Sequence, residues 1–189
     1  MINMKNILLM SALFTISATA LHADEAQMKS LKGEGVSIVK RFGGTLKPEL
    51  KKALKGGGPA HAIGVCSEQA PAIAQKLRAD TGWDVKRVSL KARNASSAVP
   101  DAWERKVLEQ FDARQMKGES AKKMAFSEVV DGQFRFMKAQ GVEAVCLTCH
   151  AAEVKPEVEA ALKEKYPQDK ARGYSLGQIR GAFSLAKDL

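Results

Sequence analysis

Apolar side chains recur every three or four residues through two N-terminal stretches, residues 28–42 and 46–54. This spacing is typical of helices that bury one face. Gly43-Gly44 lies between the two stretches, and Gly56 to Pro59 follows the second. We therefore expect a long helix, a break and a shorter helix, with one long N-terminal helix as the alternative.

Three further segments carry helical patterns. Ser67 is suited to cap a helix that runs to Gly82. Asp101 and Glu104 have the spacing of a capping box, ahead of an apolar pattern that ends at Gly118. The segment from residue 156 to 165 predicts a short helix that Tyr166-Pro167 ends.

Alternating or β-branched patterns predict the strands. Residues 83–93 are rich in Val, Trp and Leu, and residues 179–185 alternate between apolar and other side chains. Residues 122–130 and 133–139 flank Asp131-Gly132, a pair that favours the type I′ turn of a hairpin. Strands separated by helices, with one plain hairpin, predict an antiparallel α+β domain.

The strongest chemical signal is Cys146-Leu147-Thr148-Cys149-His150. C-x-x-C-H is the attachment sequence of a c-type haem, in which two thiols bond the haem vinyl groups and the imidazole becomes an axial iron ligand. A redox disulfide would need a thioredoxin-like βαβ context, and a zinc site would need ligands at a second knuckle. The sequence has neither, so we expect one covalently bound haem.

The N-terminus indicates export. A short charged region precedes the apolar run of residues 7–16, and small residues follow it. This pattern predicts a secretory signal peptide over residues 1–23, with the mature chain beginning at Leu21 or Asp24. Residues 24–189 would then form a single haem domain in the bacterial periplasm.

The charge and composition of the chain narrow the classes of binding partner that we expect. The 189 residues carry a formal net charge of +9, which favours acidic protein partners or anionic surfaces, although a merely soluble basic protein fits as well. We find no basic patch interleaved with aromatic residues, as nucleic-acid binding would require. The mature chain has no second apolar run long enough for a membrane helix. The oligomeric state stays open.

The residues alone do not identify the second axial ligand of the iron. Cys66 is the cysteine that the motif does not use, small residues surround it, and the expected helix start at Ser67 would favour a thiolate. An open iron is one alternative. The other side chains that could ligate are a histidine and four methionines, which have core packing or a surface loop as their ordinary roles: His61, Met28, Met116, Met124 and Met137.

Three residues after the motif are candidate partners for haem propionates. Arg172, Tyr174 and Arg180 follow the motif closely enough to fold back over it, and propionates need hydrogen-bond donors. Ordinary surface arginines on a solvated loop are the equal alternative.

Nearly the whole mature chain resembles a known family, the small periplasmic single-haem c-type cytochromes with a PAS-like antiparallel sheet and His/Cys axial ligation. The matching stretches are residues 62–66 through 70–74, 93–94 through 100–104, 134–138, 146–150, 166–177 and 180–182. The chain departs from the family at Ala95, Ser97 and Gln178, outside the haem ligands. The resemblance implies that Cys146 and Cys149 carry the haem, His150 is proximal, Cys66 is distal, and the fold is PAS-like.

Two functions follow as hypotheses. With both axial positions filled, the iron suits single-electron transfer, and a thiolate ligand gives a lower potential than a methionine does. Alternatively, Cys66 leaves on reduction and the protein senses redox state or a diatomic gas, with its output passing through a partner. A peroxidase would need an open distal position, which ligation by Cys66 would block, so we expect a carrier or sensor rather than an enzyme.

Overall fold

The structure is a computed structural model that describes the backbone of residues 7–189 and the side chains of residues 25–189. It divides into two compact units, Met1–Gly35 and Val36–Leu189. The predicted signal peptide, residues 1–23, lies outside the part whose side chains are described. Within the described residues, no helix combines the length and the apolar character that a membrane crossing requires.

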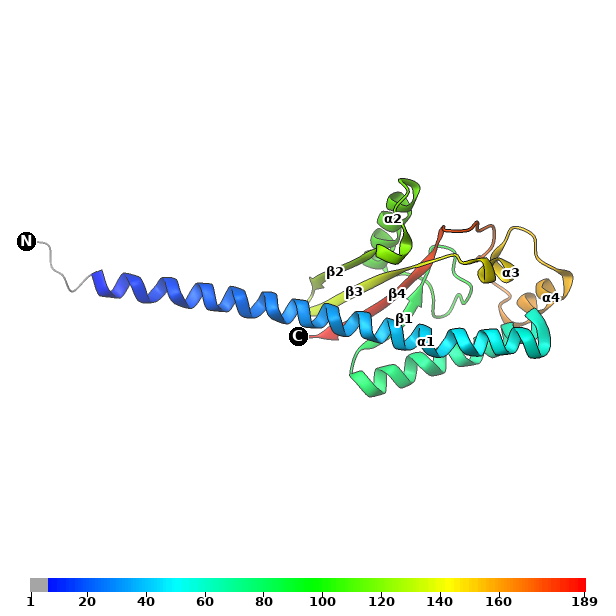
Figure 1. Ribbon diagram of the computed structural model, residues 1–189, viewed down its shortest axis with the longest axis horizontal. Helices are drawn as coiled ribbons and strands as arrows, with labels where there is room; N and C mark the ends of the chain where they lie inside the picture. The colour runs from blue at the N-terminus through cyan, green and yellow to red at the C-terminus, as the bar shows by residue number, and fades with distance from the viewer. Residues whose placement is uncertain (1–6) are drawn as a thin grey trace, which may run out of the picture. The chain divides into compact units, whose positions relative to one another are not determined.

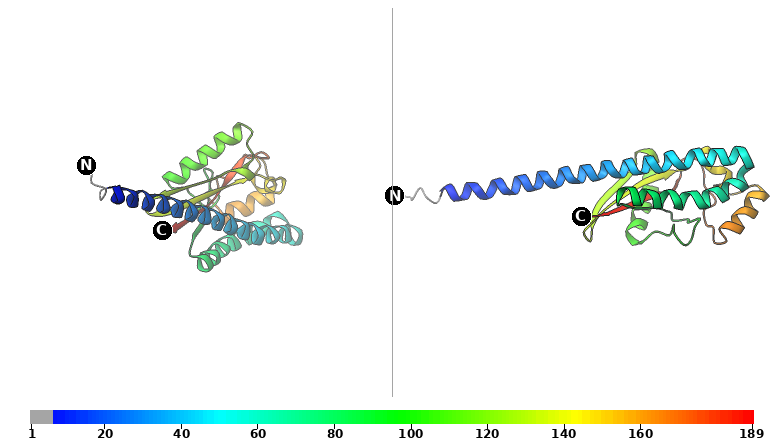
Figure 2. Two further views of the ribbon diagram at one scale, coloured as in Figure 1. Left: turned by 60° about the vertical axis from the view of Figure 1, so that its left-hand side comes forward. Right: turned by 90° about the horizontal axis from the view of Figure 1, so that it is seen from below.

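Helix α1 spans Ile7–Thr81 and has one kink, at Gly58, where the backbone adopts φ 73° and ψ −173°. Glycine tolerates this positive φ because it has no Cβ. Pro59 then occupies the first position of the second arm, where its fixed φ suits a helix start. Residues 36–57 and 59–81 run back along each other (Figures 1 and 2), and Arg41 joins them through a 2.7 Å ion pair with Asp80.

Two expectations about α1 were wrong. The helix continues through Gly43-Gly44, so the alternative of one long helix holds as far as the kink. Ser67 does not begin a helix but lies inside the second arm, where its Oγ donates to the carbonyl oxygen of Gly64 at 2.7 Å. A serine hydroxyl can bond its own preceding turn as readily as it can cap a helix.

The four strands form one antiparallel sheet in the order β1-β4-β3-β2 (Figure 1). Their bounds are Asp84–Val88 for β1, Ala125–Val130 for β2, Gln133–Gly141 for β3 and Ile179–Asp188 for β4. Both turn residues of the hairpin, Asp131 and Gly132, have positive φ, as the type I′ prediction requires. The antiparallel α+β prediction is confirmed.

The strand bounds differ from the predicted ones. The strand expected over residues 83–93 ends at Val88, because the backbone N–H of Ser89 donates to Ala98 and the chain turns away. The 3₁₀ helix η2, Ala121–Lys123, takes the start of the predicted first hairpin arm. Strand β4 continues past residue 185, since its outer end pairs with both β1 and β3.

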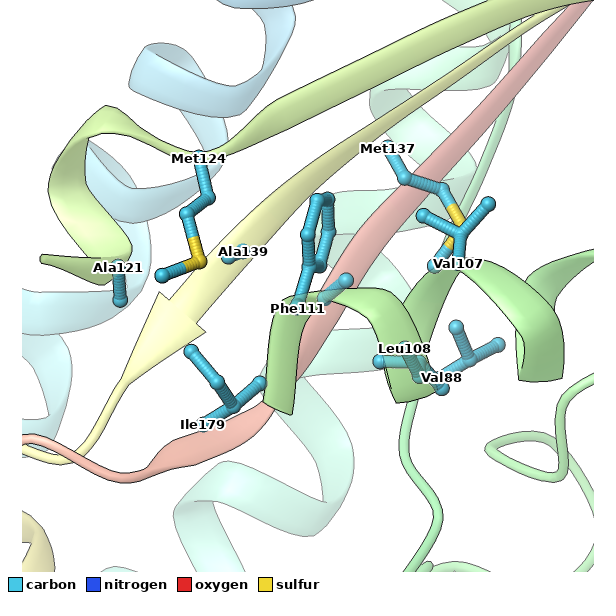
Figure 3. Packing of buried hydrophobic residues seen from close by; sticks show 10 residues of the cluster. Val88, Val107, Leu108, Phe111, Ala121, Met124, Met137, Ala139 and Ile179 are labelled. Atoms are coloured by element: carbon cyan, nitrogen blue, oxygen red, sulfur yellow. The ribbon is translucent and has the colours of Figure 1, made fainter. Parts of the chain in front are cut away.

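Helix α2, Ala102–Met116, covers one face of the sheet, and Figure 3 shows the core between them. Its N-terminus has the predicted capping box of Asp101 and Glu104. Glu104 is fully buried and is paired there with Lys86 and Ser184. The cluster consists of Val88, Val107, Leu108, Phe111, Ala121, Met124, Met137, Ala139, Ile179 and Ala182.

The other face of the sheet packs on the part of α1 that follows residue 35. The rings of Phe42 and Phe183 meet edge to face, with centroids 5.2 Å apart. At one end of the sheet, the 3₁₀ helix η3, Ala144–Cys146, leads into helix α3, Leu147–His150, and helix α4 spans Pro156–Lys165. Ile63 of α1 packs against Val158 and Leu162 of α4. This end of the sheet therefore gathers the cysteines and the histidine.

Candidate functional site

The C-x-x-C-H segment forms a tight turn. Helix η3 runs directly into α3, so Cys146, Cys149 and His150 lie on consecutive turns. The backbone N–H of Glu143 donates to the sulfur of Cys146 at 3.3 Å. Cys66, Cys146 and Cys149 all carry free thiols. Both thiols of the motif are thus free for bonding to another group.

The His150 ring is held in one tautomer. Its Nδ1 lies 2.8 Å from the carbonyl oxygen of Ala171, which can only accept, and 3.1 Å from a guanidinium nitrogen of Arg93, which can only donate. The shorter contact, together with the Arg180 N–H that faces Nε2 at 3.4 Å, assigns the proton to Nδ1. Nε2 then holds the lone pair, which is the donor that a metal requires. Burial, reinforced by the charges of Arg180 and Arg93, lowers the pKa of His150 to about 2, so the ring is neutral.

A buried ion pair positions that carbonyl. Asp169 accepts from the backbone N–H of Ala171 at 2.8 Å and from Nε of Arg93 at 3.3 Å. Arg93 also donates to the carbonyl oxygen of Cys149 at 2.5 Å. The side chains of Arg93 and Asp169 are only 14% and 7% exposed. They tie the loop that carries Ala171 to the turn that carries His150.

Arg180 reaches the site through an irregularity in β4. The sheet register pairs Gln140 with Gly181 and Gly141 with Ile179, which leaves Arg180 as the extra residue of a bulge. A bulge re-aims the side chain of its extra residue. Nε of Arg180 lies 3.4 Å from Nε2 of His150, and burial lowers the pKa of this guanidinium to about 10.

The other two predicted propionate partners have different surroundings. Tyr174 is buried, and its ring meets that of His150 edge to face at 6.1 Å. Arg172 bonds Asp169 at 3.1 Å and Glu159 at 2.6 Å, so its charge already has two carboxylate partners. The structure therefore brings Tyr174 and Arg180 to the imidazole and turns Arg172 toward acidic side chains.

Cys66 faces the same region from the second arm of α1. Burial raises the pKa of its thiol; the charge of Arg87 lowers it, and that of Cys149 raises it. These two residues are therefore electrostatic neighbours of Cys66. The expectation that Cys66 lies at a helix N-terminus was wrong, because the arm begins at Pro59, about two turns earlier. Helix-end amides do not lie beside this thiol.

The site has a surplus of positive charge. Arg87 lies over the ring of Phe42 at 5.4 Å, and burial lowers its pKa. Among the ion pairs of the described residues, none involves Arg87 or Arg180. Partly or largely buried guanidinium groups without carboxylate partners fit an anionic ligand.

The alternative axial ligands lie in other settings. Met124 and Met137 are fully buried in the core between α2 and the sheet, and Met116 is 78% exposed. His61 is exposed on the second arm of α1. Met28 belongs to the unit formed by residues 1–35. Of these side chains, the two core methionines have a complete packing role already.

The model of the Tll0287-like family matches residues 9–187. The chain belongs to the Tll0287-like family. A search of the solved structures matched the crystal structure of the cyanobacterial heme-protein Tll0287 with a TM-score of 0.66 and 27% sequence identity. The match covers 82% of this chain and 93% of that one. No curated protein matches the chain.

The donor set of this Tll0287-like chain fits a haem. Two free thiols, a neutral imidazole with its lone pair on Nε2 and two guanidinium groups without carboxylate partners lie at one end of the sheet. Sequence reasoning found the motif, Cys66 and Arg180. It did not assign roles to Arg87, Arg93 or Asp169, because isolated charged residues carry no signal of what they contact after folding.

Proposed function

We propose that the chain is an exported cytochrome of the Tll0287-like family that binds one haem covalently and transfers single electrons. The observation that carries the proposal is the pair of free thiols, Cys146 and Cys149, beside a neutral His150 with its lone pair on Nε2. The related Tll0287 is itself a cyanobacterial haem protein, which supports the same cofactor here.

Each residue has a role in this proposal. Cys146 and Cys149 bond the haem vinyl groups, His150 is the proximal ligand and Cys66 is the distal ligand. Arg180, Arg87 and Tyr174 are the donors for the propionates, while Arg172 contributes less because Asp169 and Glu159 already neutralise it. The bound haem supplies an iron that cycles between Fe(III) and Fe(II).

The chain's own residues favour a low potential. The carbonyl of Ala171 accepts the Nδ1 proton of His150, which makes the imidazole a stronger electron donor. A thiolate from Cys66 would donate more strongly still and stabilise Fe(III). Ligands on both faces would leave no position for a substrate, so electron transfer is favoured over catalysis.

The proposal includes location and fold family. Residues 1–23 are removed as a signal peptide, residues 24–189 form one haem domain in the periplasm, and the antiparallel sheet is of the PAS-like type. Mass spectrometry of the exported protein tests the cleavage site and the covalent haem together. A mass equal to residues 24–189 or 21–189 plus one haem is the expected result.

Haem-based sensing is the second candidate. Cys66 lies on the arm of α1 that follows the Gly58 kink, whereas His150 lies in the covalent attachment turn. The distal ligand can therefore move without breaking the attachment. Binding of CO to the reduced protein, with loss of Cys66 ligation, would favour this function.

Low-temperature EPR of the ferric protein, beside Cys66→Ser, tests the ligation. A low-spin thiolate signal in the wild type that disappears in Cys66→Ser is the expected result. His61→Ala is the matched control, because His61 is exposed on the same arm five residues earlier. A spectrum that Cys66→Ser leaves unchanged would remove Cys66 as a ligand, and haem lost in denaturing gels would refute covalent attachment.

A further inference from the structure

A group of lysines surrounds the start of the attachment turn. Lys47 of α1 forms a 2.7 Å ion pair with Glu143, whose backbone N–H donates to the sulfur of Cys146. The hydrogen bond from Lys47 lowers the pKa of Glu143, and the charges of Lys122 and Lys51 lower it further. The carboxylate of Glu143 is therefore paired with Lys47 and lies in the electrostatic field of Lys51 and Lys122, while its backbone N–H contacts Cys146.

These lysines are free to meet a partner. Lys51 and Lys122 are exposed, and the Lys47 side chain is 60% exposed. Lys47 and Lys51 are four residues apart and share a face of α1, whereas Glu49 between them points away. The group thus keeps a positive surplus that Glu143 only partly neutralises.

Two exposed apolar side chains belong to segments next to Glu143. Val145 is 36% exposed and lies inside the attachment turn, and Leu176 is 67% exposed. Leu176 belongs to a turn that is fixed beside Val142, because Gly177 N–H donates to the Val142 carbonyl at 2.9 Å. Exposed apolar side chains near charged ones are a usual feature of docking sites between proteins.

We propose that Lys47, Lys51 and Lys122, with Val145 and Leu176, form a docking surface for an acidic one-electron carrier protein. The inference rests on the proposed function, since it names the redox partner of the haem that Cys146 would hold. During the exchange one electron passes between the partner and the iron, and no bond forms or breaks. Complementary charge speeds the encounter of such proteins and makes its rate depend on salt.

An acidic plant-type [2Fe–2S] ferredoxin is the probe, because it is a one-electron donor of low reduction potential. The second-order rate constant for reduction of the ferric protein is measured by laser flash between low and high ionic strength. The rate constant of the wild type should fall about tenfold or more as salt screens the surface charges. At low salt, the rate constant of Lys51→Glu/Lys122→Glu should be about tenfold below that of the wild type, and it should change little when salt is added.

Arg105→Glu/Lys106→Glu is the matched control. Both residues are exposed on α2, and the substitution changes the net charge by the same amount. This control should stay within about twofold of the wild type. Equal loss in both double variants, or no loss in Lys51→Glu/Lys122→Glu, would overturn the proposal.

Two further measurements distinguish a failure of the docking proposal from a failure of the proposed function. Calorimetric titration with oxidised ferredoxin measures docking without any haem chemistry, so binding by a protein that lacks covalent haem would contradict the proposed function alone. Cosedimentation with phosphatidylglycerol vesicles tests an anionic membrane instead. Vesicle binding that the patch substitutions abolish, with an unchanged ferredoxin rate, would overturn the protein-docking proposal.

Discussion

The Nδ1 atom of His150 lies 2.8 Å from the carbonyl oxygen of Ala171, and Asp169 holds the backbone N–H of that same residue. The orientation of the imidazole is thus determined by a loop some twenty residues further along the chain. Asp169 and Arg93 are positioning residues, because they touch the loop and the turn rather than the Nε2 atom of His150.

Asp169→Asn is expected to raise the reduction potential. The substitution removes the ion pairs with Arg93 and Arg172, loosens the Ala171 carbonyl and weakens electron donation from His150. The loss of a nearby negative charge acts in the same direction. A rise of some tens of millivolts in a redox titration is expected, since about 59 mV is tenfold for one electron.

Glu159→Gln is the control for that variant. It removes a carboxylate from the same Arg172 but leaves the contacts of Ala171 in place. Its potential should change much less than that of Asp169→Asn. Equal shifts in the two variants would mean that charge alone, and not the position of the carbonyl, sets the effect.

Arg180→Gln is expected to lower the potential. The Arg180 guanidinium lies 3.4 Å from Nε2 of His150, and a positive charge at that place favours the reduced iron. Its removal should lower the potential by some tens of millivolts, again measured by redox titration against about 59 mV per tenfold change. Arg172→Gln should have a smaller effect because two carboxylates already pair with Arg172. The reverse order of the two shifts would contradict this assignment.

Gly181→Ala is expected to destabilise the sheet. Gly181 has φ 156°, and a Cβ at this position would overlap the carbonyl oxygen of Val88. A loss of about 2 kcal/mol in the free energy of unfolding, measured by urea titration, is expected from strain of this kind. Gly44→Ala lies in an open part of α1 and should instead add about 1 kcal/mol. A neutral Gly181→Ala would show that the bulge can shift.

The Asp101 cap should make stability depend on pH. Burial would raise the pKa of Asp101, but the N–H of Glu104 and the guanidinium of Arg135 hold it below its ordinary value. The ionised form therefore stabilises the fold above the unfolded pKa of about 3.9, and this contribution disappears as the pH falls through the lower folded pKa.

Unfolding of Asp101→Asn and Asp101→Ala at several pH values tests the cap. Asparagine keeps the cap and loses the charge, so its deficit against the wild type should shrink below about pH 4. Alanine also loses the cap and should cost about 1 kcal/mol even in acid. A deficit of Asp101→Asn that does not vary with pH would contradict the role of the charge.

The features that the sequence predicted are local ones. Asp131-Gly132 and the capping box of Asp101 and Glu104 depend on a few adjacent residues, so their patterns were sufficient. Ser67 was misplaced because a serine hydroxyl serves equally as a cap or as a bond to its own preceding turn, and only the kink at Gly58 decides between them. The helical Gly43-Gly44 shows that packing outweighs the low helix propensity of two glycines.

The missing parts of the site are non-local ones. Arg93 and Asp169 form a hydrogen bond although 76 positions of sequence separate them, and no sequence pattern at either residue predicts the other. The re-aimed Arg180 depends on a bulge, which arises from the pairing of β4 with β3 and not from the residues of β4 alone. The groups proposed to bond a cofactor are therefore easier to predict from a motif than the groups that orient them.

The position of β4 between β1 and β3 has a consequence for how the chain folds. Within the sheet, β1 pairs with β4 alone, so Asp84 meets Ala186 only after a long loop has closed. Such non-local closure is slow. While it is pending, the segment with Cys146 and Cys149 stays reachable in an unfinished chain. The proposed covalent attachment of haem to these thiols would therefore have an interval in which to occur before β4 completes the sheet.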